Sequence, residues 1–100
     1  MNLQKKLKDN LILHYVESNN WDHDDDGEEI TTMYELSFSF YDKNYMVYVS
    51  AERLNEEYAR LASVEGDSEL FDSFESLMED EYWSEITTQC NAFEKWKKEL

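Results

Sequence analysis

The sequence predicts an α+β fold in two layers: a short N-terminal helix, a three-stranded antiparallel meander and two to three C-terminal helices packed on one face of the sheet. Between residues 11 and 50, three runs alternate in polarity or consist mostly of β formers. After residue 50, apolar side chains recur at helical spacing. The 100-residue chain has no proline and two glycines, so we expect residues 1–100 to form one domain without a flexible linker.

The N-terminal segment supplies the first two expected elements. Residues 2–9 are expected to form the short helix, because Leu3 and Leu7 lie four positions apart on one helical face. Residues 11–18 are expected to form the first strand. Its two alternating sets are both mostly apolar, so we expect both faces of this strand to be covered.

The second and third strands are expected to form a hairpin. Residues 30–41 alternate cleanly, and the apolar face consists of Tyr34, Leu36, Phe38 and Phe40. Residues 42–44 are expected to form the turn, because Asp and Asn bond the local backbone and tolerate left-handed geometry. Residues 45–50 then return as the third strand.

The C-terminal half contains successive helical stripes. Ser50 is expected to cap a helix over residues 51–63 that ends near Gly66, with the stripe Leu54, Tyr58, Leu61 and Ala62. Asp67 or Ser68 is expected to start the next helix, whose stripe is Leu70, Phe71, Phe74, Leu77 and Met78. The stripe changes phase near residues 83–84, which predicts a kink or short connection before a last stripe of Ile86, Cys90, Phe93, Trp96 and Leu100.

Charge is the most informative global property. The net charge is −15, beyond the roughly 2–8 that serves solubility in a small domain. Residues 17–85 hold 21 acidic residues against Lys43, Arg53 and Arg60, a net charge of −18, while the other lysines lie near the two ends. Direct binding of nucleic acid is disfavoured, because it depends on Lys and Arg contacts to phosphates. With 15% aromatic residues the chain is still expected to fold.

Other features of the sequence indicate where the protein is located and whether it binds membranes. A single cysteine, Cys90, excludes an internal disulfide. No apolar run approaches the roughly 18 residues of a membrane span, and no signal-peptide pattern is present. We therefore expect a cytoplasmic protein of a bacterial host cell that does not bind membranes. We expect a monomer, with a dimer through an exposed strand edge as the alternative.

The segment WDHDDDGEEI, residues 21–30, resembles the first half of a calcium-binding loop. Asp22, Asp24 and Asp26 would be loop positions 1, 3 and 5, followed by Gly27 at position 6. Position 12, which requires a bidentate carboxylate, is Met33, and the flanks have strand patterns. We therefore expect no specific metal site, and we interpret the segment as an acidic connection between strands.

No catalytic constellation is predicted either. Cys90 lies on an apolar stripe, where it is expected to pack as a small hydrophobic residue, and His14 is expected to pack within a strand. No nucleophile elbow and no phosphate-binding glycine loop are present. We expect no enzyme activity and no cofactor.

The acidic surface instead predicts an inhibitor that mimics nucleic acid. Rows of carboxylates on strands or helices repeat at about 5–7 Å and would present fixed negative charge to a basic groove. The expected contact residues in the acidic segments are Asp22, Asp24, Asp25, Asp26, Glu28, Glu29, Glu69, Asp72, Glu79, Asp80 and Glu81. The alternatives are an immunity protein that neutralises a basic nuclease toxin and a general acidic protein-interaction module.

The pattern resembles small acidic phage-encoded anti-CRISPR proteins that inhibit type II-A Cas9. The stretch FYDKNYMVYVSAE is similar to that family's hairpin, and LMEDEYW is similar to the acidic segment between its later helices. The resemblance implies DNA mimicry toward Cas9 or another CRISPR effector, with contacts from Asp42, Asn44, Glu79, Asp80 and Glu81. This chain departs from the family in its longer acidic first connection, its turn without glycine and its longer last helix.

Overall fold

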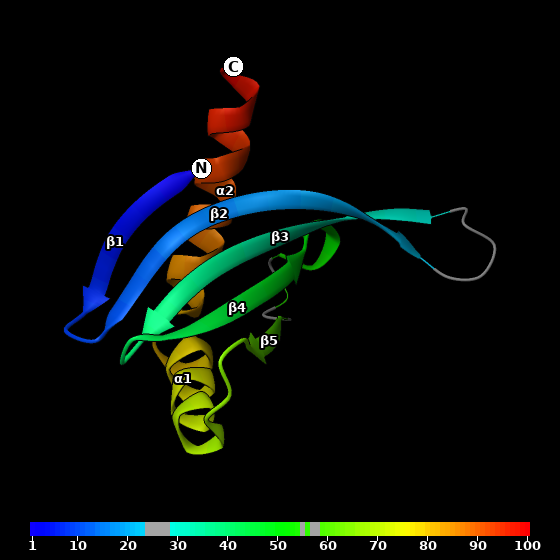
Figure 1. Cartoon of the computed structure of the whole chain (residues 1–100). Helices are drawn as coiled ribbons and strands as arrows, with labels where there is room; N and C mark the ends of the chain where they lie inside the picture. The colour runs from blue at the N-terminus through cyan, green and yellow to red at the C-terminus, as the bar shows by residue number, and fades with distance from the viewer. Residues whose placement is uncertain (24–28, 55, 57–58) are drawn as a thin grey trace.

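The computed structural model describes residues 1–23, 29–54, 56 and 59–100, and for residues 21–23 and 29–31 it describes the backbone alone. Five antiparallel strands are followed by two helices (Figure 1). The strands pair in chain order as a five-stranded meander. The strands are β1 (Asn2–Lys8), β2 (Leu11–His23), β3 (Glu29–Phe40), β4 (Lys43–Ser50) and β5 (Arg60–Ser63), and the helices are α1 (Ser68–Asp80) and α2 (Trp83–Lys98).

The predicted N-terminal helix is wrong, because residues 2–8 form the edge strand β1. Lys5 pairs with Leu13 and Lys6 with Ile12 across the β1–β2 ladder. Residues four apart share a face in a helix and also in a strand, so the spacing of two leucines did not distinguish the two. Gln4 adopts a left-handed φ of 47°, and the register shifts between Asn2 and Lys5. The lysines of this strand make the edge unfavourable for pairing with another chain.

The predicted helix over residues 51–63 is also wrong. Among the described residues of this range, only Ala51–Arg53 form a helical turn, of 3₁₀ type, in which the Ser50 hydroxyl accepts a bond from the Glu52 N–H at 3.3 Å. The predicted stripe residue Tyr58 lies outside the described residues. Residues 60–63 instead form β5, with Leu61 opposite Val47. Pairing with the free edge of β4 supplies backbone hydrogen bonds that outweigh the helical propensity of a segment rich in Ala, Glu, Arg and Leu. The sheet therefore has five strands where three were predicted.

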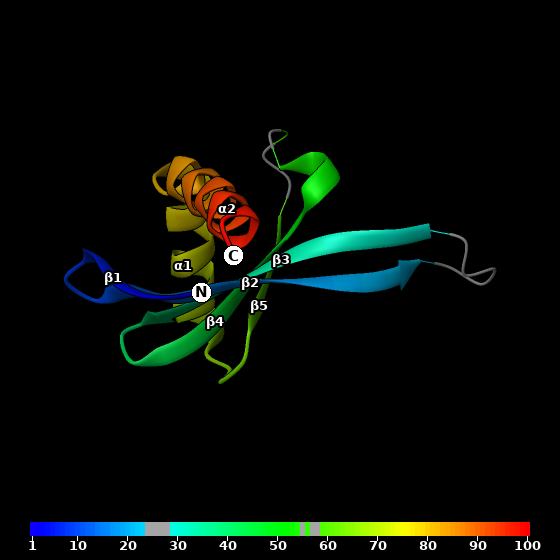
Figure 2. The same cartoon turned by 90° about the horizontal axis from the view of Figure 1, so that it is seen from above.

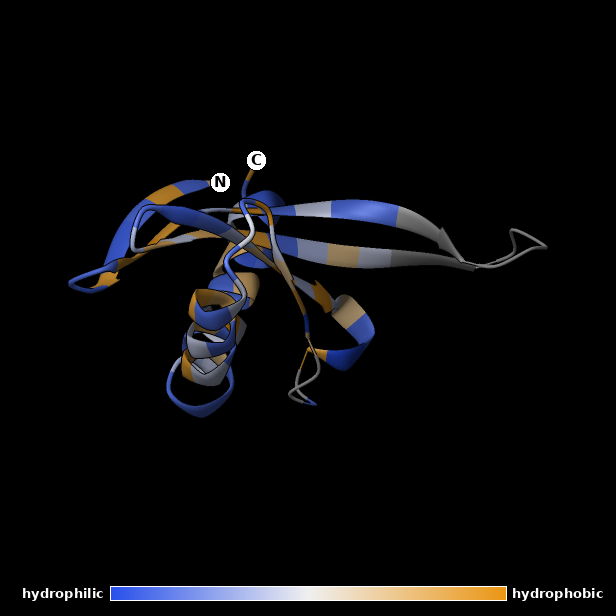
Figure 3. Ribbon diagram, turned by 60° about the horizontal axis from the view of Figure 1, so that its bottom comes forward, coloured by the Kyte–Doolittle hydropathy of each residue, from blue (hydrophilic) through white to orange (hydrophobic). Residues whose placement is uncertain are grey.

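Strand β2 changes phase at His14, so the prediction that both of its faces are covered is wrong. Leu13 pairs with Phe38 and Tyr15 pairs with Ser37, which leaves His14 as the extra residue of a β-bulge. The buried side chains are therefore Leu11, Leu13 and Val16. Figure 2 shows both helices on the same side of the sheet, and Figure 3 shows hydrophobic and hydrophilic residues alternating along the strands.

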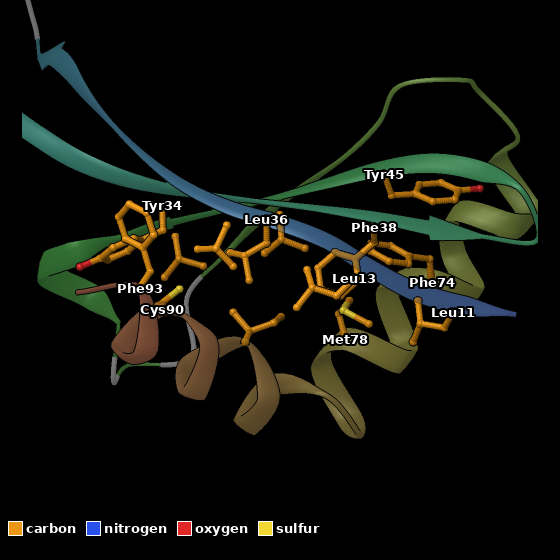
Figure 4. Packing of buried hydrophobic residues seen from close by; sticks show 14 of the residues in the cluster. Leu11, Leu13, Tyr34, Leu36, Phe38, Tyr45, Phe74, Met78, Cys90 and Phe93 are labelled. Carbon is orange, nitrogen blue, oxygen red and sulfur yellow. The ribbon is translucent and has the colours of Figure 1, made fainter. Parts of the chain in front are cut away.

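The core lies between the sheet and the two helices (Figure 4). Phe74 of α1 stacks on Tyr45 at 4.7 Å between ring centroids and meets Phe38 edge-on at 5.6 Å. Ile86, Cys90 and Phe93 of α2 extend this core, and Cys90 is fully buried, as predicted. The stripe of α2 ends there, because Trp96 and Leu100 are exposed.

The helices begin and end close to the predicted positions. The Asp67 carboxylate caps α1 by accepting a bond from the Leu70 N–H at 3.0 Å. Gly66 just before it has a φ of 68°, the left-handed region that glycine adopts without strain. Helix α1 ends at Asp80 and α2 begins at Trp83, which matches the predicted connection near residues 83–84.

Candidate partner-binding surface

The outer side of α1 carries a dense set of carboxylates. Phe74 and Met78 are buried and fix which side of α1 faces the sheet. At 100° per residue, the outward acidic residues fall within an arc of roughly 140° opposite those two side chains. We call this surface the α1 acidic face, and it consists of Glu69, Asp72, Glu75, Glu79 and Asp80.

The carboxylates of the α1 acidic face have no partner within the described part of the chain. Four of the five residues are exposed and Glu75 is half-buried. None of them takes part in the ion pairs or side-chain hydrogen bonds of the described residues. The sequence from Leu61 to Glu94 contains no lysine, arginine or histidine. No described base therefore forms an ion pair with this face, and none lies within the sequence of α1 itself.

Glu85 and Glu94 of α2 differ from the carboxylates of the α1 acidic face, because both are bonded within the fold. Glu85 forms an ion pair with Lys5 of β1 and accepts a bond from the Gln89 amide at 3.1 Å. Glu94 accepts a hydrogen bond from the Tyr34 hydroxyl. Burial, together with this bond and the charge of Glu94, raises the pKa of Tyr34 above its ordinary value. These carboxylates hold α2 against the sheet and are not available in the same way to a partner.

The two hairpin residues predicted from the resemblance, Asp42 and Asn44, differ in whether their side chains are already bonded. Asp42 is exposed, and with Tyr41 it forms the β3–β4 turn at left-handed φ values of 64° and 51°. These are the values that a two-residue type I′ hairpin turn requires. The Asn44 side chain donates to Glu65, so its amide is already bonded within the chain. Asp42 is thus free to contact a partner, whereas Asn44 has a structural bond.

The described ends of the WDHDDDGEEI segment, residues 21–23 and 29–30, lie on a hairpin arm that projects beyond the rest of the sheet (Figure 1). The ladder continues to the pair His23–Glu29, well past the last β3–β4 pair, Met33–Ser50. Asp24, Asp25, Asp26, Gly27 and Glu28 lie outside the described residues, as do the side chains of Trp21, Asp22 and Glu29. The described flanks are strands, where a calcium loop of this type requires helices.

The predicted contact residues do not form one site. Strand β3 runs from the arm to the β3–β4 turn, and its 12 residues span roughly 36 Å at about 3.3 Å per residue. Figures 1 and 2 show the arm and the turn at opposite ends of the molecule. The described structure does bring four predicted residues together on one element, because Glu69, Asp72, Glu79 and Asp80 all lie on the α1 acidic face.

Two features were missing from the predicted contact residues. Glu75 completes the α1 acidic face, and its helical spacing from Asp72 and Glu79 already places it on the side away from the apolar stripe. A polar group also lies on the sheet face opposite the helices, where His14 bonds Gln4 and Ser39 at 2.9 Å each. That contact depends on the bulge and on the β1–β2 pairing, which the sequence pattern did not reveal.

Comparison with known proteins identifies no relative: no family model, no curated protein and no solved structure matches this chain. The order of elements that supported the resemblance to anti-CRISPR proteins also differs from the observed order, in which β1 replaces the expected helix and the sheet has five strands. No helix in the described residues is both long enough and apolar enough to cross a membrane.

Proposed function

We propose that the protein is an inhibitor that mimics nucleic acid and occupies the basic groove of a nucleic-acid-binding protein with its α1 acidic face. The spacing of charge supports this proposal. Residues 69–80 span roughly 16 Å of helix axis at about 1.5 Å per residue. Their five carboxylates give one negative charge per about 3–4 Å, and one strand of B-DNA carries one phosphate per about 3.4 Å.

The way α1 is held supports tight association. Phe74 and Met78 are fully buried against the sheet, so the positions of the carboxylates on the backbone are fixed during folding. A preorganised surface loses less conformational entropy when it binds. Unlike charges also steer the encounter and raise the association rate, most strongly at low salt. The mimic would thus reach the groove quickly and exclude nucleic acid by occupying its phosphate sites.

The partner class follows from the sign and density of this charge. A groove that contacts phosphates presents Lys and Arg at matching spacing. CRISPR effectors and other nucleases have such grooves, and the resemblance of LMEDEYW to an anti-CRISPR segment places CRISPR effectors first among the targets to test. The acidic pair Glu79 and Asp80 lies in this stretch and also on the α1 acidic face.

A competition assay tests the proposal. A panel of guide-loaded CRISPR effectors and basic nucleases would each be bound to fluorescent DNA and titrated with the protein at about 50 and 300 mM salt. We expect the protein to displace DNA from at least one member, more effectively at the lower salt. If no member of the panel releases DNA at either salt concentration, the proposal is wrong.

Matched variants locate the surface. Glu79→Gln/Asp80→Asn removes two charges from the α1 acidic face, and Glu52→Gln/Glu99→Gln removes two exposed charges elsewhere. We expect the first variant to weaken inhibition at least tenfold, because close interfacial charge pairs contribute about 1.5 kcal/mol or more each. The second variant should change inhibition little. Equal weakening by both would show that net charge acts without a specific face.

A further inference from the structure

The sheet has a second face that no described helix covers (Figure 2). This open face carries half-buried side chains with apolar or aromatic groups, namely Ile12, Tyr15, Met46 and Tyr48. Both helices and the buried core lie on the other side. The exposed parts of these side chains give the open face apolar and aromatic contact area in addition to its charges.

Two glutamates lie directly opposite each other on this open face. Glu17 of β2 pairs with Glu35 of β3 in the antiparallel ladder. Both alternate with the buried residues Val16 and Leu36, so their side chains leave the sheet on the open side. Directly opposed like charges destabilise a sheet. Neither carboxylate takes part in an ion pair or side-chain hydrogen bond of the described residues.

Aromatic rings flank the two carboxylates. Tyr48 pairs with Glu35 across the β3–β4 ladder, and Tyr15 lies two positions before Glu17 on the same side of β2. Burial and the negative charges of Glu17 and Glu35 raise the pKa of Tyr15, which indicates that its hydroxyl lies close to both carboxylates. Arg60 lies opposite Tyr48, two strands from Glu35. At the other end of this row, the N-terminal ammonium of Met1 donates to the carbonyl of Val16, next to Glu17, at 2.7 Å.

We propose that the open face docks a basic protein segment and receives an arginine side chain between Glu17 and Glu35, beside the rings of Tyr15 and Tyr48. A guanidinium is planar, presents five N–H donors and stacks on aromatic rings, so one arginine can bond both carboxylates and contact a ring. A lysine ammonium offers a compact charge without that geometry. The half-buried Ile12 and Met46 add apolar contact to the neighbouring residues of the segment.

An NMR titration tests this site with the full chain and short blocked peptides. The probes are acetyl-Gly-Arg-Gly-Arg-Gly-amide and its lysine counterpart. We expect the arginine peptide to shift the amide signals of Tyr15, Glu17, Glu35 and Tyr48 more than those of α1, and to bind more tightly than the lysine peptide. Signal changes confined to α1, or equal affinity for both peptides, would overturn the proposal.

A charge-matched pair of variants completes the test. Glu17→Gln/Glu35→Gln removes both carboxylates, and Glu69→Gln/Asp72→Asn removes the same charge from the α1 acidic face. The first should weaken the arginine peptide about five- to tenfold, because each exposed charge pair contributes a factor of up to about five. The control should weaken it less than twofold. The first variant should melt no lower than the wild type, since it removes a repulsion. Equal loss of peptide affinity in both variants would refute the site. That outcome would leave the DNA competition test of the proposed function unaffected.

Discussion

Replacing Asp72 by lysine is expected to stabilise the fold while weakening the proposed inhibition. Asp72 is exposed and lies at the centre of the α1 acidic face, three residues after Glu69 and three before Glu75. Neighbouring like charges on a helix cost about 0.2–0.5 kcal/mol per pair, and opposite charges gain a similar amount. Lysine would convert two repulsions into two attractions, so the gain should be about 0.8–2 kcal/mol.

Urea unfolding followed by circular dichroism measures this gain. The Asp72→Asn variant removes the repulsions without adding attractions, so it should give about half the effect. A gain of 1 kcal/mol corresponds to about 4–8 °C in Tm for a domain of this size. At roughly 1 M salt the Debye length falls to about 3 Å, so most of the gain should disappear. A lysine variant that is less stable than the wild type, or a gain that does not depend on salt, would refute the inferred repulsion.

Three further predictions concern the fold. Tyr45→Phe should leave stability unchanged or raise it by up to about 1 kcal/mol in urea unfolding, because the buried hydroxyl has no hydrogen-bond partner within the described residues. Tyr41→Gly should raise stability by about 1 kcal/mol in thermal melts, because Tyr41 holds a left-handed φ of 51°. Burial and the charge of Glu94 raise the pKa of Cys90 from 9.0 to about 12, so the folded thiol keeps its proton where the unfolded thiol loses it. Stability should therefore fall as pH rises from about 9 toward 12, and Cys90→Val should reduce this slope in urea unfolding.

Each of these expectations has an outcome that contradicts it. A Phe variant at Tyr45 that loses more than about 1 kcal/mol would mean that the hydroxyl has a bonded partner. A Gly variant at Tyr41 that melts lower would mean that the edge contact between Tyr41 and Phe40, at 4.6 Å between ring centroids, outweighs the backbone strain. An unchanged pH slope in the Cys90 variant would assign the alkaline loss to the tyrosines whose pKa is raised, namely Tyr15, Tyr34 and Tyr45.

Local patterns predicted the elements whose residues differ clearly between faces. Strand β3 alternates without interruption, and its buried residues Tyr34, Leu36, Phe38 and Phe40 are the four predicted. The start of α1 at Asp67 was predicted because a capping carboxylate has a local mechanism. Such features depend on residues that are close in the sequence, so the sequence alone is sufficient to predict them.

Elements that depend on distant partners were missed. The spacing of Leu3 and Leu7 fits a helix and a strand equally well, and pairing with β2 decides between them. The helix expected over residues 51–63 competes with a strand that pairs with the edge of β4. In β2, apolar residues in both alternating sets indicate a phase change as readily as two covered faces, and the bulge at His14 is that change.

The sequence predicted that the candidate surface is acidic, but it predicted only part of where its residues lie. Acidic residues were expected to contact a partner, and helical spacing groups those of α1 on one face. The pairing of Glu17 with Glu35 depends on the β2–β3 register, which shifts by one residue at the bulge. A register without the bulge would place Glu17 on the buried side of the sheet. The open-face site therefore required the structure.

The distribution of charge between the two helices supports the proposal that the α1 acidic face binds a basic partner. Helix α2 follows the usual electrostatic rules, because Lys95, Lys97 and Lys98 lie in its last turn and Glu85 pairs with Lys5. Helix α1 has no base in its last turn. Its repulsions cost on the order of 1 kcal/mol, in a class of domains whose total stability is about 5–15 kcal/mol. Interspersed lysines would give solubility without that cost, so solubility alone does not explain a helix face of one sign, whereas the proposed basic partner groove would explain it.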